Sequence, residues 1–116
     1  MQLIINEKEI ELYFGIDFIE FLDKKYSLKR EGVEFAMGVS NAMVYLQQAN
    51  PRILIDIIQA GTITDSKKIG VSEIQRWVET QEDLDWMFSD FLGQLETAPM
   101  TKTAVARMRR AQAEQV

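Results

Sequence analysis

The stretch Glu34-Phe-Ala-Met-Gly-Val-Ser-Asn-Ala-Met-Val-Tyr-Leu-Gln-Gln-Ala-Asn-Pro51 decides how this chain is organised, since it is long, apolar and almost uncharged. Its only charged side chain is Glu34, and small residues are interleaved with two methionines through its middle. Apolar side chains recur at helical spacing and predict a helix over 33–49. A helix that is apolar on most sides is either central in its own fold or shared with another chain. Both interpretations stay open at this point.

Four residues of this helix form the candidate partner-binding surface: Met37, Gly38, Met43 and Val44. A glycine inside a helix costs roughly 1 kcal/mol relative to alanine, so Gly38 indicates a close backbone approach. Methionine side chains adapt to varied shapes better than branched ones do. The same residues could equally line the core.

The N-terminal residues predict a β-hairpin over 2–14. Over residues 9–14, apolar and polar side chains alternate, as they do in a strand with one buried face. A turn at residues 7–8 would place Ile5 opposite Ile10. A lone two-stranded hairpin is marginally stable in water, so we expect this one to pack on helices or on a neighbouring subunit.

Helical spacing and capping signals predict the other elements of the chain. The expected fold is mainly α with an N-terminal β-hairpin, in which about five short helices pack around the central apolar helix. These helices are expected at about 16–26, 33–49, 51–60, 72–79 and 81–96. Residues 1–97 are expected to form a single globular domain, hereafter the body, with a core that includes Phe18, Leu22, Ile57, Trp77 and Phe91.

The chain contains no histidine and no cysteine. Histidine is the usual general base near neutral pH and the commonest metal ligand. Without it and without a thiolate, most routes to catalysis are closed. We therefore expect no enzymatic activity, no cofactor and no metal.

Two stretches resemble ligand-binding loops but lack the residues that such loops need. Gly61 precedes Lys67 by six positions, as in a phosphate-binding loop, yet Ser66 stands where that loop requires a glycine. The aspartates over 83–90 suggest a calcium loop, but apolar side chains fill the spacing between them. Both sites are excluded by their spacing.

Charge is unevenly distributed along the chain. Residues 1–97 carry a net charge of −8 and residues 98–116 one of +3, which together give the chain's −5. Because phosphate contacts need a basic surface, the acidic body disfavours nucleic acid as the main ligand. Residues 98–116 are expected to be a flexible basic tail, with Arg107, Arg109 and Arg110 as candidate contacts. With no run of roughly 18 apolar residues and no signal peptide, we expect no membrane association.

Three segments carry a resemblance to a known family. Asn6-Glu-Lys-Glu-Ile-Glu-Leu12 and Phe14-Gly-Ile-Asp-Phe-Ile-Glu-Phe-Leu-Asp-Lys-Lys-Tyr26 resemble the opening of tail assembly chaperones from long, non-contractile-tailed phages (siphoviruses) and prophages of Gram-positive hosts. Gly32-Val-Glu-Phe-Ala-Met-Gly38 is similar to the segment that follows in that family. The resemblance covers about residues 3–60, and 72–97 in general pattern. This chain has Glu7 where the family would have a glycine in the hairpin turn.

The resemblance implies a chaperone, not an enzyme, that coats the long helical tape measure protein and keeps it soluble during tail morphogenesis. It is displaced as tail tube subunits polymerise. In many such phages a longer, frameshifted product also recruits the major tail tube protein. The expected partners are therefore the tape measure protein, the tube protein through such a product, and further copies of this chain. The expected location is the host cytoplasm, not the mature virion.

Two other classes stay open beside the chaperone. One is a small structural or adaptor protein of the virion. The other is a regulator whose basic tail binds nucleic acid, supported only by the arginines at 107, 109 and 110.

Overall fold

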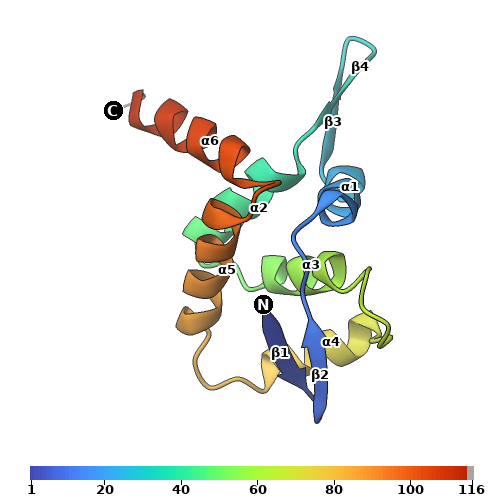
Figure 1. The fold of residues 1–116 in the computed structure, drawn as a ribbon. Coiled ribbons are helices and arrows are strands. Elements are labelled where there is room, and N and C mark those ends of the chain that lie inside the picture. Colours follow the sequence, from blue (N-terminus) through green and yellow to red (C-terminus); the bar gives the residue numbers. More distant parts are fainter. Residues whose placement is uncertain (115–116) are drawn as a thin grey trace.

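The computed structural model describes residues 1–114, which form six helices and two antiparallel hairpins (Figure 1). The expected mainly α fold with an N-terminal β-hairpin is confirmed, although these residues contain six helices rather than about five. In chain order the elements are β1 (Gln2–Ile5), β2 (Lys8–Glu11), α1 (Ile16–Lys25), β3 (Ser27–Arg30), β4 (Val33–Ala36), α2 (Gly38–Gln47), α3 (Arg52–Gly61), α4 (Val71–Glu79), α5 (Asp85–Thr97) and α6 (Lys102–Glu114).

The β1–β2 hairpin buries one face, as the alternation of its side chains predicts. Its turn is Asn6-Glu7 rather than residues 7–8, so Leu3 pairs with Ile10. Both turn residues have positive φ, 52° and 69°, which is the backbone that a two-residue type I′ turn requires. Glu7 therefore adopts a conformation that glycine reaches more easily. Because the register differs by two residues from the predicted one, the same side chains still face the core.

The predicted helix over 33–49 is wrong in its first part. Val33–Ala36 forms strand β4, which pairs with β3 in a second hairpin, and α2 begins only at Gly38. Glu31 and Gly32 make the turn, with φ values of 52° and 79°. This is again type I′ geometry, and Gly32 adopts it without steric cost. The turn and its two strands therefore form where the spacing of the apolar residues predicted the first turn of a helix.

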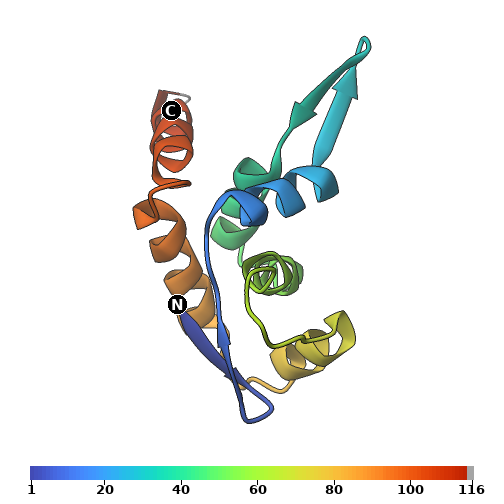
Figure 2. The ribbon, with the colours of Figure 1, turned by 45° about the vertical axis from the view of Figure 1, so that its right-hand side comes forward.

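The most buried helix is α3 rather than the predicted central helix. Within α2 four residues are buried, whereas α3 buries seven: Ile53, Leu54, Asp56, Ile57, Ile58, Ala60 and Gly61. Both ribbon views place α3 in the middle of the fold, next to α1 and α4 (Figure 1, Figure 2). A central apolar helix over 33–49 is therefore not found, because β4 takes up its first residues and one side of α2 stays partly exposed.

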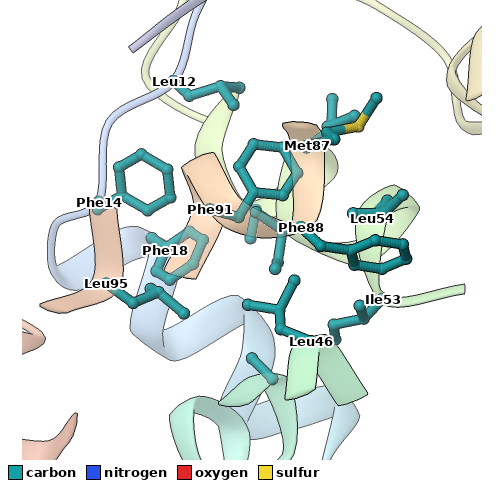
Figure 3. Close-up of a cluster of buried hydrophobic side chains, with 14 of the residues drawn as sticks. Leu12, Phe14, Phe18, Leu46, Ile53, Leu54, Met87, Phe88, Phe91 and Leu95 are labelled. Carbon is teal, nitrogen blue, oxygen red and sulfur yellow. The ribbon is translucent and has the colours of Figure 1, made fainter. Parts of the chain in front are cut away.

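The apolar core lies where α1, α2, α3 and α5 meet the N-terminal hairpin (Figure 3). Of the five residues predicted to lie there, Trp77 is half-buried and four are buried: Phe18, Leu22, Ile57 and Phe91. Phe18 packs edge to face against Phe14, with ring centroids 4.9 Å apart. This arrangement stabilises an aromatic pair beyond the area that it buries.

The segment expected to be a flexible tail, residues 98–116, contains helix α6. Thr101 is buried, and its hydroxyl donates to the Leu95 carbonyl at 2.7 Å. Val105 is 2% exposed and packs α6 against the core. Residues 115–116 lie outside the described part of the chain. The mobility of this segment stays a prediction.

Candidate interaction surface

Two hollows on the surface meet at Met100, which is 50% exposed. The hairpin-side groove, of about 220 Å³, lies at the base of the β3–β4 hairpin, and its apolar lining comes from Ile19, Ala36, Met37, Val39, Met100 and Ala104. The N-terminal groove, of about 290 Å³, has an apolar lining from Met1, Leu12, Tyr13, Phe14, Ala98, Pro99 and Met100. Because both grooves include Met100, they border one another. Residues far apart in the sequence thus form one surface, in which the apolar side chains lie beside a few polar ones: Glu11, Asp23, Ser40 and Gln94.

The structure separates the four residues predicted to bind a partner. Met37 and Gly38 line the hairpin-side groove. Met43 is fully buried in the core, and Val44 is half-buried. Met43 thus has no surface to offer to a partner in this conformation. A partner-binding role for the four residues stays a proposal, which here rests on Met37 and Gly38.

Gly38 lets the start of α2 approach the end of α1 closely. Its N–H donates to Asp23 Oδ1 at 3.0 Å. A Cβ atom at this position would lie 2.7 Å from the backbone of Leu22 and of Asp23. The close approach that the sequence indicates is therefore present, although Gly38 begins the helix instead of lying inside it. This contact fixes the position of the groove lining.

The β3–β4 hairpin extends away from the helices, and all eight of its strand residues are exposed (Figure 2). Its register places Leu28 opposite Phe35 and Arg30 opposite Val33. Since opposed residues lie on the same side of a sheet, the apolar side chains of this set share one face. An uncovered apolar face on a two-stranded hairpin indicates a second contact surface.

A buried carboxylate anchors the root of this hairpin. Asp56 of α3 is 2% exposed. It forms an ion pair with Lys25, whose Nζ lies 2.8 Å from Asp56 Oδ1, and it accepts a hydrogen bond from the Tyr26 hydroxyl. Burial, followed by the hydrogen bond to Asp56, raises the pKa of Tyr26 above its ordinary value of 10.0. Tyr26 directly precedes β3, so these contacts join the hairpin to the most buried helix.

The three arginines predicted to contact a partner lie on α6. All three are exposed, and Arg109 forms an ion pair with Glu96 of α5. Gln47 and Gln112 exchange two hydrogen bonds, of 3.3 and 3.1 Å, between α2 and α6. These contacts hold α6 beside the body. A role of the arginines in partner binding stays a prediction.

Within residues 1–114, no group of three or more acidic side chains is placed to hold a metal ion. None of the helices in this range is long and apolar enough to cross a membrane. Asp23 is the one ionisable side chain that lines the hairpin-side groove in the described structure. This lining suits contact with an apolar partner better than proton transfer.

A model of the phage tail assembly chaperone protein family, TAC, matches residues 2–109. The chain belongs to this family. The match includes both hairpins, the lining of both grooves apart from Met1, and the first part of α6, so this tail assembly chaperone contains the candidate surface within its family region. Searches of curated proteins and of solved structures gave no match. The resemblance of the sequence to tail assembly chaperones is confirmed.

Proposed function

We propose that this tail assembly chaperone binds the tape measure protein through its two grooves, and that it does so without catalysing a reaction. The observation that carries the proposal is the exposed apolar surface around Met100 on a chain of this family. The resemblance of the sequence implies a long helical client whose apolar stripes need cover until the tail tube encloses them. The grooves provide a surface on which these apolar stripes can be buried.

The shape and chemistry of the grooves suit an apolar helix. A helix that lies in a groove places anchors at i, i+3, i+4 and i+7, so successive turns need successive hollows. The two grooves, which border one another at Met100, provide such a pair. Met37 and Met100 are flexible side chains that accept different helix registers, as binding along a long client requires.

We further propose that the chaperone acts in the host cytoplasm and leaves before the virion is mature. Its net charge of −5 favours solubility of the complex with an apolar client. Contact with the major tail tube protein is expected only through a longer, frameshifted product. Self-association of the chaperone is a separate proposal, which rests on the β3–β4 hairpin.

Met100→Asp tests the groove proposal because it places a charge where the two grooves meet. Burial of an unpaired carboxylate against an apolar helix costs about 2 kcal/mol or more, which is roughly 30-fold or more in affinity. We expect the variant to lose co-purification with the tape measure protein of the same phage. Since Met100 is half exposed, circular dichroism should show an unchanged fold.

Ile63→Asp is the matched control. Ile63 is also an exposed apolar side chain, but it lies in the loop between α3 and α4, outside both grooves. This variant should retain the tape measure protein in the same experiment. A folded Met100→Asp variant that still binds would place the client elsewhere. Equal loss of binding in both variants would also exclude a specific role of the grooves.

A further inference from the structure

The two grooves contain two acidic side chains, and these differ in whether a cation lies beside them. Glu11 of the N-terminal groove forms an ion pair with the terminal ammonium of Met1, at 3.3 Å. Asp23 lines the hairpin-side groove and forms no ion pair within residues 1–114. An unpaired charge that borders an apolar contact surface selects for a partner of the opposite charge.

The carboxylate of Asp23 is held in place by the start of α2. Its Oδ1 accepts the Gly38 N–H at 3.0 Å, and the close approach of the two helices leaves no room for a Cβ atom at Gly38. Among the described residues no donor reaches Oδ2. One oxygen thus satisfies the backbone of α2, and the other is available to a partner. A group that is already oriented loses little conformational entropy on binding.

Apolar side chains lie beside Asp23 on the same surface. Ile19 precedes it by one turn of α1, and Met37 and Val39 border the same groove. A helix that buries its apolar stripe against these residues places the edge of the stripe beside Asp23. Lysine and arginine suit this edge, because their apolar stems can lie on the groove while their charged ends reach the carboxylate.

We propose that the helical segment bound by the grooves is basic, with lysine or arginine along the edge of its apolar stripe, and that Asp23 pairs with one of these cations. This inference rests on the proposed binding of the tape measure protein and names the chemistry of the bound segment. The charge of the whole chain acts in the same direction, since a net charge of −5 attracts a basic segment during encounter.

Capping of α2 is the alternative role for Asp23. The N-cap residue Met37 makes no side-chain hydrogen bond, and Asp23 Oδ1 supplies an acceptor for the Gly38 N–H instead. Capping needs only an acceptor oxygen, whereas an ion pair needs the negative charge. Asp23→Asn separates the two roles, because the amide keeps an acceptor oxygen and loses the charge. Urea unfolding should show that this variant is as stable as the natural chain.

Three synthetic helical peptides test the proposal. They share one apolar stripe and differ only at its edge, which carries lysine, glutamine or glutamate. Fluorescence anisotropy with the full chain should show the tightest binding for the lysine peptide and the weakest for the glutamate peptide. Asp23→Asn should lose roughly three- to fivefold in affinity for the lysine peptide, as expected of a partly exposed ion pair. It should bind the glutamine peptide as the natural chain does.

Asp17→Asn is the matched control. Asp17 is an exposed aspartate of the same helix, and it lines neither groove. This variant removes the same charge and should bind all three peptides as the natural chain does. Equal loss of the lysine peptide in both variants would overturn the proposal. Equal binding of the lysine and glutamine peptides by the natural chain would do so as well.

Carbodiimide coupling locates the ion pair directly, because it joins a carboxylate to an amine that touches it. Mass spectrometry should find the lysine peptide coupled to Asp23 in the natural chain. Coupling only to other carboxylates would contradict the assignment of Asp23.

Failure of this proposal is distinguishable from failure of the groove proposal. Met100 lies where the grooves meet, under the apolar stripe rather than at its edge, so Met100→Asp should lose the glutamine peptide. If it still binds that peptide, the grooves are not the site. If it loses the peptide but Asp23→Asn keeps full affinity for the lysine peptide, the grooves stand and the pairing with Asp23 is wrong.

Discussion

At the scale of single residues, Gly38 is the position where one added carbon has the clearest effect. In Gly38→Ala the new Cβ would lie 2.7 Å from the backbone of Leu22 and of Asp23, which has no flexible end to move aside. We expect a loss of about 1–3 kcal/mol in the free energy of unfolding, typical of overpacking. The midpoint of urea unfolding measures this loss.

For the same substitution at position 93, Gly93→Ala, we expect the opposite effect on stability. Gly93 lies inside α5, and nothing stands within 4 Å of an added Cβ. Alanine there should stabilise the chain by about 0.5–1 kcal/mol, because glycine is the poorer helix former. If Gly38→Ala were as stabilising as Gly93→Ala, the close approach of α1 and α2 would not restrict position 38.

The hydrogen bond from Tyr26 to Asp56 makes the free energy of unfolding depend on pH. Tyr26→Phe removes the hydroxyl that donates to Asp56, and at neutral pH we expect this to cost about 1.5 kcal/mol, at the low end for a bond to a charged group. Burial and this bond raise the pKa of Tyr26 in the folded chain above 10.0, so above about pH 10 the unfolded chain releases the proton first. The stability from this bond is therefore complete below pH 10 and decreases as pH rises further.

Urea unfolding at neutral pH and above pH 10 measures this dependence. The difference in stability between the natural chain and Tyr26→Phe should narrow at the higher pH. Tyr13→Phe, at an exposed tyrosine, should show no such change. A difference for Tyr26→Phe that stays constant with pH would contradict a hydrogen bond that depends on the neutral phenol.

At the scale of elements, α6 combines few buried side chains with several trypsin sites. Of its 13 residues only Val105 is buried, and segments with little buried apolar surface open most readily. We expect brief trypsin treatment to cut first in α6, at Lys102, Arg107, Arg109 or Arg110. Mass spectrometry of the first fragments would identify the sites. Earlier cleavage at Lys24 or Arg76 would contradict this order.

The elements that the sequence predicts well are those with a buried face. Apolar side chains alternate in the N-terminal hairpin and recur at helical spacing in α3 and α5, because these elements face the core. Neither strand of the β3–β4 hairpin buries a residue, so no core imposes a pattern on them. The available signal is local: Glu31-Gly32 is a suitable type I′ turn between β-branched, aromatic and charged residues that alternate.

At the scale of the whole molecule, the sequence predicts part of the candidate surface. Met37 and Gly38 stand out because they lie in an uncharged stretch, and both line a groove. Met100 comes from the connection between α5 and α6, far along the chain, and no local spacing links it to Met37. Only the packing of α6 beside α2 brings the two together. The same packing shows why residues 98–116 cannot be interpreted from their composition alone.

All eight strand residues of the β3–β4 hairpin are exposed. The residues that determine what this hairpin contacts are therefore different from the residues that stabilise the core. Substitutions there remove no core contact, so they should leave the free energy of unfolding of the helices nearly unchanged. Natural selection can therefore alter the specificity of this hairpin without a compensating change in the core. Related phages can therefore diverge in what this hairpin contacts while they retain the same helical scaffold.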